Sequence, residues 1–312
     1  MDTKTTIDPL QFNDPDITAD GEARASVDFR ALDTLWLNTG TLCNIECSHC
    51  YIESSPLNDR LSYLSIAEAS VYLNEIQSLG LPTREIGITG GEPFMNPDII
   101  SIVEDALGRG FSVLILTNAM KPMAHHQASL IGLFKAYGDK LTLRVSIDHY
   151  DPALHQAERG AATWNSAIKG LKFLSDARAS FNIAGRMLSH DTESEMRAGY
   201  EALMAQHHIN LDAQDPTKLT LFPEMDSSVE ATEITTACWQ KLGVRPQDQM
   251  CASARMVVKR KDASKPVIIA CTLLPYDREF ELGTTLAESF EPVKLNHRHC
   301  SQFCVLGGAS CS

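Results

Sequence analysis

Three cysteines stand within eight residues, at Cys43, Cys47 and Cys50, and this spacing constrains the chain more than any other feature. They follow directly on an apolar run at 35–37 that predicts a strand. Three thiolates on one short loop can wrap three corners of a four-iron cubane, because each corner iron needs one external ligand. The fourth iron then stays open, as a metal position does in a catalytic site.

The alternatives for this loop are a zinc knuckle or three buried free thiols. Zinc sites favour two close Cys-x2-Cys or Cys/His pairs, and a spacing of three and then two intervening residues fits them poorly. The chain has nine cysteines and no export signal, and in a reducing cytosol their clustering favours metal binding over disulfides. The loop therefore favours an iron-sulfur cluster.

The charge balance argues against polyanionic partners. The chain carries 27 basic and 40 acidic side chains, a formal net charge of −13. This charge disfavours nonspecific binding to nucleic acid or to an anionic membrane. No apolar run approaches the roughly 18 residues of a membrane span, so we expect a cytoplasmic protein.

Short β-rich runs alternate with amphipathic stretches from Leu35 onward, which predicts an α/β fold with a parallel sheet. The strand candidates are 35–37, 85–89, 112–117, 141–147, 181–188 and 218–222. Ser65 and Glu68 predict a capping box at the start of the first helix. Six βα units are too few for a closed eight-stranded barrel, so we expect a partial (β/α)6 TIM-like barrel.

The pattern divides the chain into three parts. Residues 1–32 are acidic and lack apolar periodicity, which predicts a flexible or loosely docked arm. The barrel is expected over 33–230. Residues 231–312 contain a predicted β-hairpin, 256–259 with 267–270, flanked by cysteines. We interpret this last part as a second, small, metal-organised domain.

The cysteine loop closely resembles the cluster loop of radical S-adenosylmethionine (radical SAM) enzymes, with Asn44 after the first cysteine and aromatic rings on either side of the last. Gly90, Gly91, Glu92 and Pro93, at the end of the second predicted strand, look like the GGEP motif of that family. The resemblance implies a [4Fe-4S] cluster on the three cysteines. It also implies reductive cleavage of S-adenosylmethionine to a 5′-deoxyadenosyl radical, with an electron from a low-potential donor such as flavodoxin or ferredoxin.

The resemblance further implies contacts to S-adenosylmethionine, although each residue taken singly matches an ordinary turn or strand end. The implied set is His49 at adenine, Gly90, Gly91 and Glu92 at the methionyl amino group, Asn118 at the end of the third strand, Ser146 at the ribose or carboxylate, and Arg186 at the methionyl carboxylate. Arginine suits a carboxylate because its planar donor fork permits paired hydrogen bonds. Asp148, Tyr150 and Glu224 are candidates for substrate contact.

The C-terminal cysteines resemble the shortened SPASM, or twitch, extension of radical SAM enzymes, which carries one auxiliary [4Fe-4S] cluster. The implied ligands are Cys251, Cys271, Cys300 and Cys304, with Cys311 as a possible replacement for one of the last pair. Pro266 replaces a glycine of that family, and its full seven-cysteine pattern is absent, so we expect one auxiliary cluster. Structural zinc is the alternative. His297 and His299 are weaker candidates for this site, and Cys238 is interpreted as a buried thiol.

We therefore expect a radical SAM oxidoreductase or modifying enzyme that removes hydrogen from a small molecule or a peptide, with net oxidation. A 32-residue arm is too short for a leader-binding domain, which favours a small metabolite or a peptide delivered by a separate carrier. The alternative is a maturase-type enzyme that modifies a protein side chain. A non-catalytic metal scaffold is the remote alternative. The sequence indicates neither the substrate nor the oligomeric state.

Overall fold

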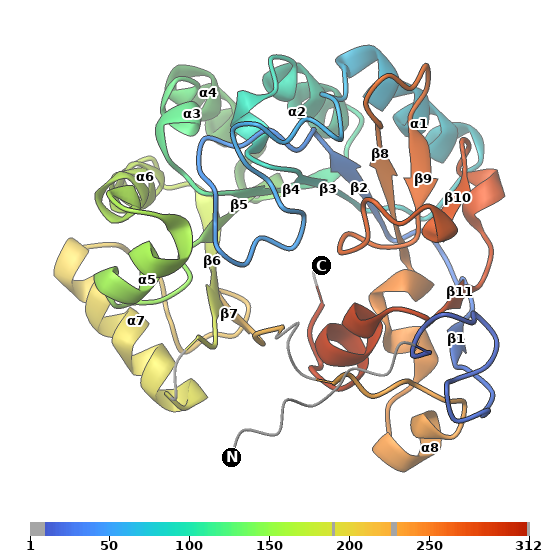
Figure 1. Ribbon diagram of the computed structural model, residues 1–312. Helices are drawn as coiled ribbons and strands as arrows, with labels where there is room; N and C mark the ends of the chain where they lie inside the picture. The colour runs from blue at the N-terminus through green and yellow to red at the C-terminus, as the bar shows by residue number, and fades with distance from the viewer. Residues whose placement is uncertain (1–9, 189–190, 226–229, 311–312) are drawn as a thin grey trace.

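The structure is a computed structural model that describes residues 10–188, 191–225 and 230–310. Its centre is a curved sheet in which six parallel strands follow one another in sequence order (Figure 1). They are β2 (Thr34–Asn38), β3 (Glu85–Thr89), β4 (Ser112–Thr117), β5 (Leu141–Ser146), β6 (Ser180–Arg186) and β7 (Leu219–Phe222). The predicted partial (β/α)6 barrel is confirmed, and each predicted strand end lies within about two residues of the observed one.

Helices connect these strands and cover the outer face of the sheet (Figure 1). They are α1 (Ile66–Ser78), α2 (Ile99–Gly108), α3 (Lys121–Ala124), α4 (Gln127–Tyr137), α5 (Pro152–Arg159), α6 (Thr163–Asp176) and α7 (Glu193–His207). The predicted capping box at Ser65 and Glu68 is present at the start of α1. Leu73, Ile88 and Leu171 belong to the apolar core between helices and sheet. No described helix has the length and apolar character needed to cross a membrane.

The sheet continues beyond the barrel at β2. Strand β8 (Ala254–Val258) pairs with β2 in parallel, and β9 (Val267–Ile269) and β10 (Glu281–Gly283) follow as antiparallel neighbours. The predicted hairpin is therefore present, but it extends the barrel sheet instead of forming a sheet of its own. The domain boundaries at residues 32 and 230 stay predictions.

The inner face of the sheet is filled by large side chains below the cysteine loop. Trp36 is fully buried and packs with Met256. A Cβ atom at Gly87 would come within 2.4 Å of the Trp36 ring, so glycine is required beside it. This packing holds strand β2, which leads into the cysteine loop, in a fixed position.

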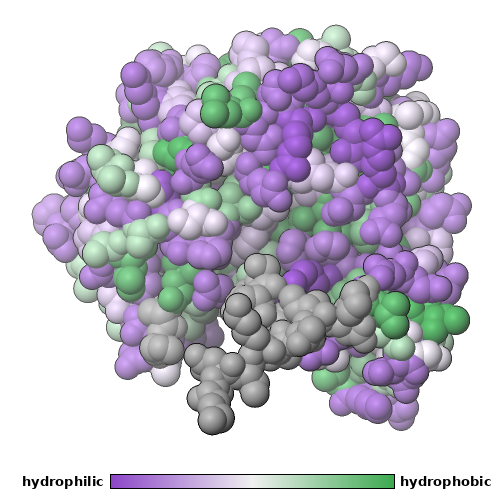
Figure 2. Space-filling view, in the orientation of Figure 1, coloured by the Kyte–Doolittle hydropathy of each residue, from purple (hydrophilic) through white to green (hydrophobic). Residues whose placement is uncertain are grey.

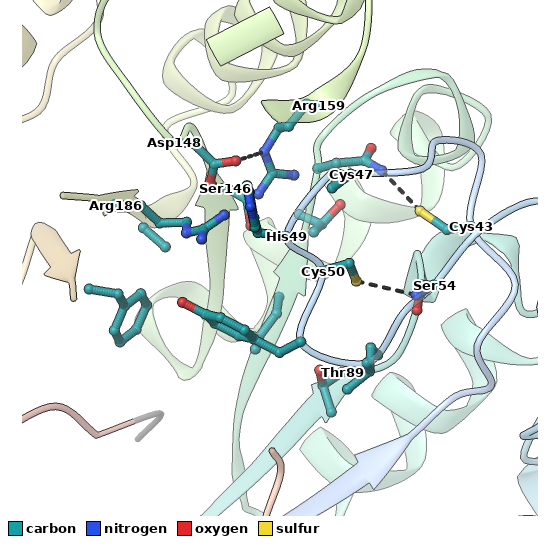
Figure 3. A pocket seen from close by; sticks show the side chains of 18 of the residues that line it. Cys43, Cys47, His49, Cys50, Ser54, Thr89, Ser146, Asp148, Arg159 and Arg186 are labelled. Carbon is teal, nitrogen blue, oxygen red and sulfur yellow. Dashed lines mark hydrogen bonds and ion pairs between the residues drawn. The ribbon is translucent and has the colours of Figure 1, made fainter. Parts of the chain in front are cut away.

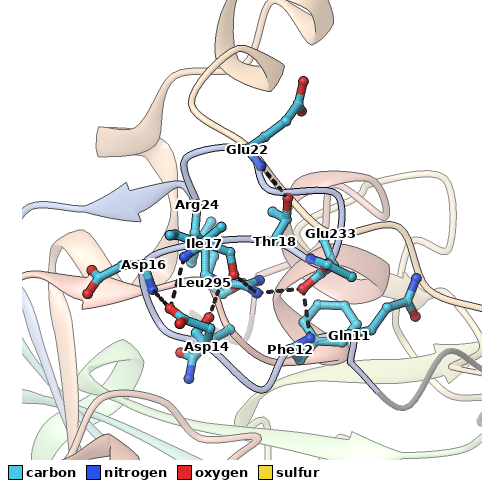
Figure 4. Close-up of polar contacts among 12 residues, drawn as sticks. Gln11, Phe12, Asp14, Asp16, Ile17, Thr18, Glu22, Arg24, Glu233 and Leu295 are labelled. Carbon is cyan, nitrogen blue, oxygen red and sulfur yellow. Dashed lines mark hydrogen bonds and ion pairs between the residues drawn. The ribbon is translucent and has the colours of Figure 1, made fainter.

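Residues 10–32, for which the sequence predicts a flexible or loosely docked arm, contact the rest of the chain in the structure. Arg24 is buried and pairs with the Glu233 carboxylate, which also accepts hydrogen bonds from the backbone N–H groups of Phe12 and Ala19, both at 2.7 Å (Figure 4). Strand β1 (Ser26–Val27) pairs with β11 (Val293–Lys294). Acidic composition predicted mobility, but one buried ion pair and these backbone contacts dock the segment.

The C-terminal segment lies between β7 and β11 in Figure 1. Its π-helix, Cys300–Val305, places Phe303 against Phe222 at the end of β7, with ring centroids 5.4 Å apart. The other short helical elements are α8 (Cys238–Leu242), Pro93–Met95, Gly138–Lys140, Pro246–Asp248, Met250–Ala252, Arg278–Phe280 and Ala287–Ser289. The face seen in Figure 2 is mainly hydrophilic, and its hydrophobic residues are scattered.

Candidate functional site

The three cysteines of the loop line one cavity of about 210 Å³ at the carboxyl ends of the parallel strands. Burial raises the pKa of the Cys43 thiol to about 12 and that of Cys47 to about 11. Such thiols stay protonated unless a cation compensates the thiolate charge, which a bound metal does. The buried thiols on one cavity wall therefore fit the metal cluster predicted for them.

Two glycines bring the end of β3 against the start of the cysteine loop. Gly90 has a φ of +144°, and Gly91 donates its backbone N–H to the carbonyl of Gly40 at 2.8 Å. A Cβ at Gly91 would lie 2.2 Å from the Leu42 carbonyl oxygen. Both glycines line the cavity. Their lack of a side chain is thus required by the approach of two backbone segments, and it also exposes backbone to the cavity.

Glu92 is buried and faces the end of β4 instead of the cavity. Its carboxylate accepts hydrogen bonds from Thr117 Oγ1 at 2.8 Å, Asn118 N at 2.8 Å and Phe94 N at 3.2 Å. Burial raises its pKa to about 7 although these donors act in the opposite direction. The Glu92 carboxylate thus already accepts three hydrogen bonds from the protein. The predicted contact between Glu92 and an ammonium group stays a prediction.

The other predicted contact residues lie around the same cavity, which His49, Asn118, Ser146 and Arg186 all line. Asn118 Nδ2 is 3.9 Å from the Cys43 sulfur. Their roles as cofactor contacts stay predictions.

Arg186 presents unused donors to this cavity. Its side chain is about 8% exposed, and Nη1 lies 3.3 Å from the Glu158 carboxylate. Its Nε and Nη2 are buried without a hydrogen-bond partner among the residues that the structure describes. Buried donors of this kind are rare in native proteins, and they suit an anionic ligand.

Arg159 is a cavity residue that the sequence reasoning missed. It ends α5 and binds Asp148 through two hydrogen bonds, Nε at 2.8 Å and Nη2 at 3.0 Å (Figure 3). Burial would raise the pKa of Asp148, but the charge of Arg159 and these bonds lower it below its usual value. The sequence does contain a local signal for α5, the helix that ends at Arg159. Asp151 caps this helix, Pro152 begins it and Gly160 follows its end.

Of the three candidates for substrate contact, only Asp148 lines the cavity. The Tyr150 ring lies against α7, where a Cβ at Gly199 would be 2.4 Å from it, and its hydroxyl donates to Asp191 at 2.9 Å. Glu224 is exposed, outside the set of residues that line the cavity.

Four C-terminal cysteines line a second, smaller cavity together with His299; they are Cys251, Cys271, Cys300 and Cys304. Burial raises the pKa of Cys251 to about 11 and of Cys300 to about 12, so these thiols also need a cation to ionise. Cys311 lies outside the described residues. Cys238 lies outside both cavities, where its sulfur accepts from Thr235 N at 3.4 Å.

The two cavities adjoin each other, since Leu273 lines both. In the described part of the chain, no group of three or more His, Cys, Asp or Glu side chains is arranged around a single metal ion. A cluster distributes its ligands over several metal atoms, so four thiols around one cavity fit it without converging on a point. The identity of the metal group stays a prediction.

Comparison with known proteins gives one family. The model of the radical SAM superfamily matches residues 37–198. The chain is 31% identical to the antilisterial bacteriocin subtilosin biosynthesis protein AlbA of Bacillus subtilis over 43% of this chain and 28% of AlbA. It is 28% identical to the AdoMet-dependent heme synthase of Nitratidesulfovibrio vulgaris over 45% of this chain and 36% of that protein. The match therefore spans less than half of either relative.

A solved structure shares the fold. SuiB of Streptococcus suis, bound to S-adenosylmethionine, aligns with a TM-score of 0.57 and 13% identity over 81% of this chain and 63% of SuiB. SuiB bound to its precursor peptide SuiA gives the same TM-score at 14% identity over 89% of this chain and 66% of SuiB. At this identity the likeness concerns the fold alone.

Proposed function

Because this chain belongs to the radical SAM superfamily, whose model covers more than half of it, we propose that Cys43, Cys47 and Cys50 hold a [4Fe-4S] cluster beside a binding site for S-adenosylmethionine. The observation that carries the proposal is the single cavity on which the three thiols, the two glycines and the free donors of Arg186 meet. When bound, the cluster and its cofactor supply a 5′-deoxyadenosyl radical that removes hydrogen from the substrate.

The protein side chains orient the cofactor. Arg186 lines the cavity with two donors that have no partner among the described residues, and we assign it to the methionyl carboxylate. Arg159 also lines the cavity, but its Nε and Nη2 donate to Asp148, so we assign it to holding the cavity wall in place. The His49 ring and Arg186 both contact Glu158, and we assign His49 to the adenine of the cofactor.

The exclusion of water is a further task of the chain. Tyr51, Phe222 and Phe303 line the cavity, and Phe303 lies 6.2 Å from Tyr51 and 5.4 Å from Phe222, centroid to centroid. This aromatic wall connects the cysteine loop to the C-terminal segment. A radical formed inside such a wall is protected from solvent.

We propose an auxiliary [4Fe-4S] cluster on the four C-terminal cysteines, held in the adjoining cavity. A cluster there would supply an acceptor for one electron, which net oxidation of a substrate radical requires. The shared Leu273 wall supports this arrangement because it places the two cavities side by side. A flavodoxin or ferredoxin is the proposed electron donor.

The substrate is proposed to be a small molecule or a peptide. The peptide corresponds to the maturase-type alternative, and SuiB, whose fold resembles this one, was solved with a precursor peptide. The sequence similarity to a heme synthase favours a small molecule. Substrate-dependent release of 5′-deoxyadenosine, screened with peptides and metabolites, separates the two.

The cleavage activity itself is tested without a substrate. Anaerobically reconstituted protein with S-adenosylmethionine and dithionite should release 5′-deoxyadenosine, and Cys47→Ala should abolish the release. Cys238→Ala is the matched control, because this thiol lies outside both cavities and should leave the yield unchanged. Iron-loaded wild-type protein that yields no 5′-deoxyadenosine would contradict the proposed function.

A further inference from the structure

Ser54 carries a buried hydroxyl group that the site described so far does not use. Ser54 is one of the residues that line the cavity of the three cysteines, and it is 4% exposed. Its Oγ atom is buried and has no hydrogen-bond partner among the residues the structure describes. Leaving such a donor unpaired is costly, so native proteins seldom do so without a ligand or water that completes it.

Two backbone hydrogen bonds fix Ser54 where the cysteine loop closes on itself. Its own N–H donates to the Cys50 sulfur at 3.3 Å (Figure 3). The carbonyl of the next residue, Ser55, accepts from Cys43 N at 3.1 Å. Ser54 therefore lies beside the Cys50 thiol, and the residue that follows it is bonded to the backbone of Cys43.

The neighbouring serine shows what a purely structural hydroxyl looks like in this loop. Ser55 Oγ accepts hydrogen bonds from Leu57 N at 3.2 Å and Asn58 N at 3.1 Å, which form a side-chain turn. Ser55 does not line the cavity. The two adjacent serines thus differ: the hydroxyl of Ser55 is used by the loop, whereas that of Ser54, a residue that lines the cavity, is buried without a partner among the described residues.

We propose that the Ser54 hydroxyl donates a hydrogen bond to a sulfur atom of the cluster held by Cys43, Cys47 and Cys50. This inference rests on the proposed function. A donor at the sulfur stabilises the reduced cluster more than the oxidised one, because the reduced cluster carries more negative charge. Ser54 therefore raises the reduction potential of the cluster and eases entry of the first electron.

The test is a redox titration of the reconstituted full chain, followed by electron paramagnetic resonance in the absence of S-adenosylmethionine. The signal of the barrel cluster is identified by its change when S-adenosylmethionine is added. Ser54→Ala should lower the midpoint potential relative to wild type, with iron and sulfide content unchanged. Ser55→Ala should leave the potential at the wild-type value, and Ser54→Thr, which keeps the hydroxyl, should restore it.

Several outcomes overturn the inference. If Ser54→Ala has the same midpoint potential as wild type, the proposed hydrogen bond is refuted. It is also refuted if Ser55→Ala shifts the midpoint potential as much as Ser54→Ala does. If Ser54→Ala fails to assemble a cluster, Ser54→Thr decides: wild-type iron content and potential support the hydroxyl, and failure of both variants overturns its role. Failure of the wild-type chain itself to bind a cluster contradicts the proposed function instead.

Discussion

Arg186 Nη1 lies 3.3 Å from the carboxylate of Glu158, while the other two nitrogens of its guanidinium group have no hydrogen-bond partner in the described part of the chain. One edge of the arginine is thus held by the protein, and the residue lines the cysteine-lined cavity. A guanidinium group that is fixed on one side is well suited to bind a carboxylate with the other.

Arg186→Lys should weaken S-adenosylmethionine binding about tenfold, because the ammonium keeps the charge but loses the paired donors, worth about 1.5 kcal/mol. Equilibrium binding to the cluster-loaded protein measures this. Arg197→Lys is the matched control, since Arg197 pairs with Glu193 on α7. An unchanged dissociation constant for Arg186→Lys would remove this residue from the site.

Iron analysis separates the two proposed clusters. Wild-type protein should bind about eight irons after reconstitution, and about four after Cys43, Cys47 and Cys50 are replaced by alanine. Replacing the four C-terminal cysteines should also leave about four, because the thiols line different cavities. Wild-type protein with about four irons and stoichiometric zinc would refute the auxiliary cluster and favour the zinc alternative.

The sequence predicted those parts of the fold that local patterns determine. The strands are apolar, β-rich runs, and Ser65 with Glu68 marks the start of α1 through neighbours in the chain. Helix α5 was missed because it is short and mostly polar, with His155 as its buried residue. Arg159, at its end, was missed with it.

The local sequence patterns could not predict contacts between segments that are far apart in the chain. Arg24 and Glu233 are 209 residues apart and form a buried ion pair, so composition alone misrepresented the N-terminal segment as flexible. The parallel pairing of β8 with β2 likewise depends on the path of the chain between them. The cysteines of the second cavity were grouped by resemblance, and the structure brings four of them together.

Glu233→Ala should lower the free energy of unfolding by about 3 kcal/mol, because it leaves the Arg24 charge buried without its partner. The backbone N–H groups of Phe12 and Ala19 lose their acceptor as well. Urea denaturation measures the effect. Asp248→Ala, in the exposed pair with Arg245, should change stability little. Equal effects of the two variants would show that the docked N-terminal segment contributes no special stability.

His155 should make the fold sensitive to acid. It is fully buried, neither ring nitrogen has a hydrogen-bond partner within the described ranges, and burial followed by the charge of Arg159 lowers its pKa from 6.5 to about 4. Between these values the unfolded chain binds a proton that the folded chain does not, so stability is present above pH 6.5 and is lost as the pH falls towards 4. The loss is about 3 kcal/mol, at 1.36 kcal/mol per pKa unit.

His155→Phe, which keeps a ring against Trp164, should abolish this part of the pH dependence of stability, measured by urea denaturation between pH 4 and 6.5. His125→Phe, at an exposed histidine, is the control. Parallel stability curves for wild type and His155→Phe would show that the acid sensitivity arises elsewhere.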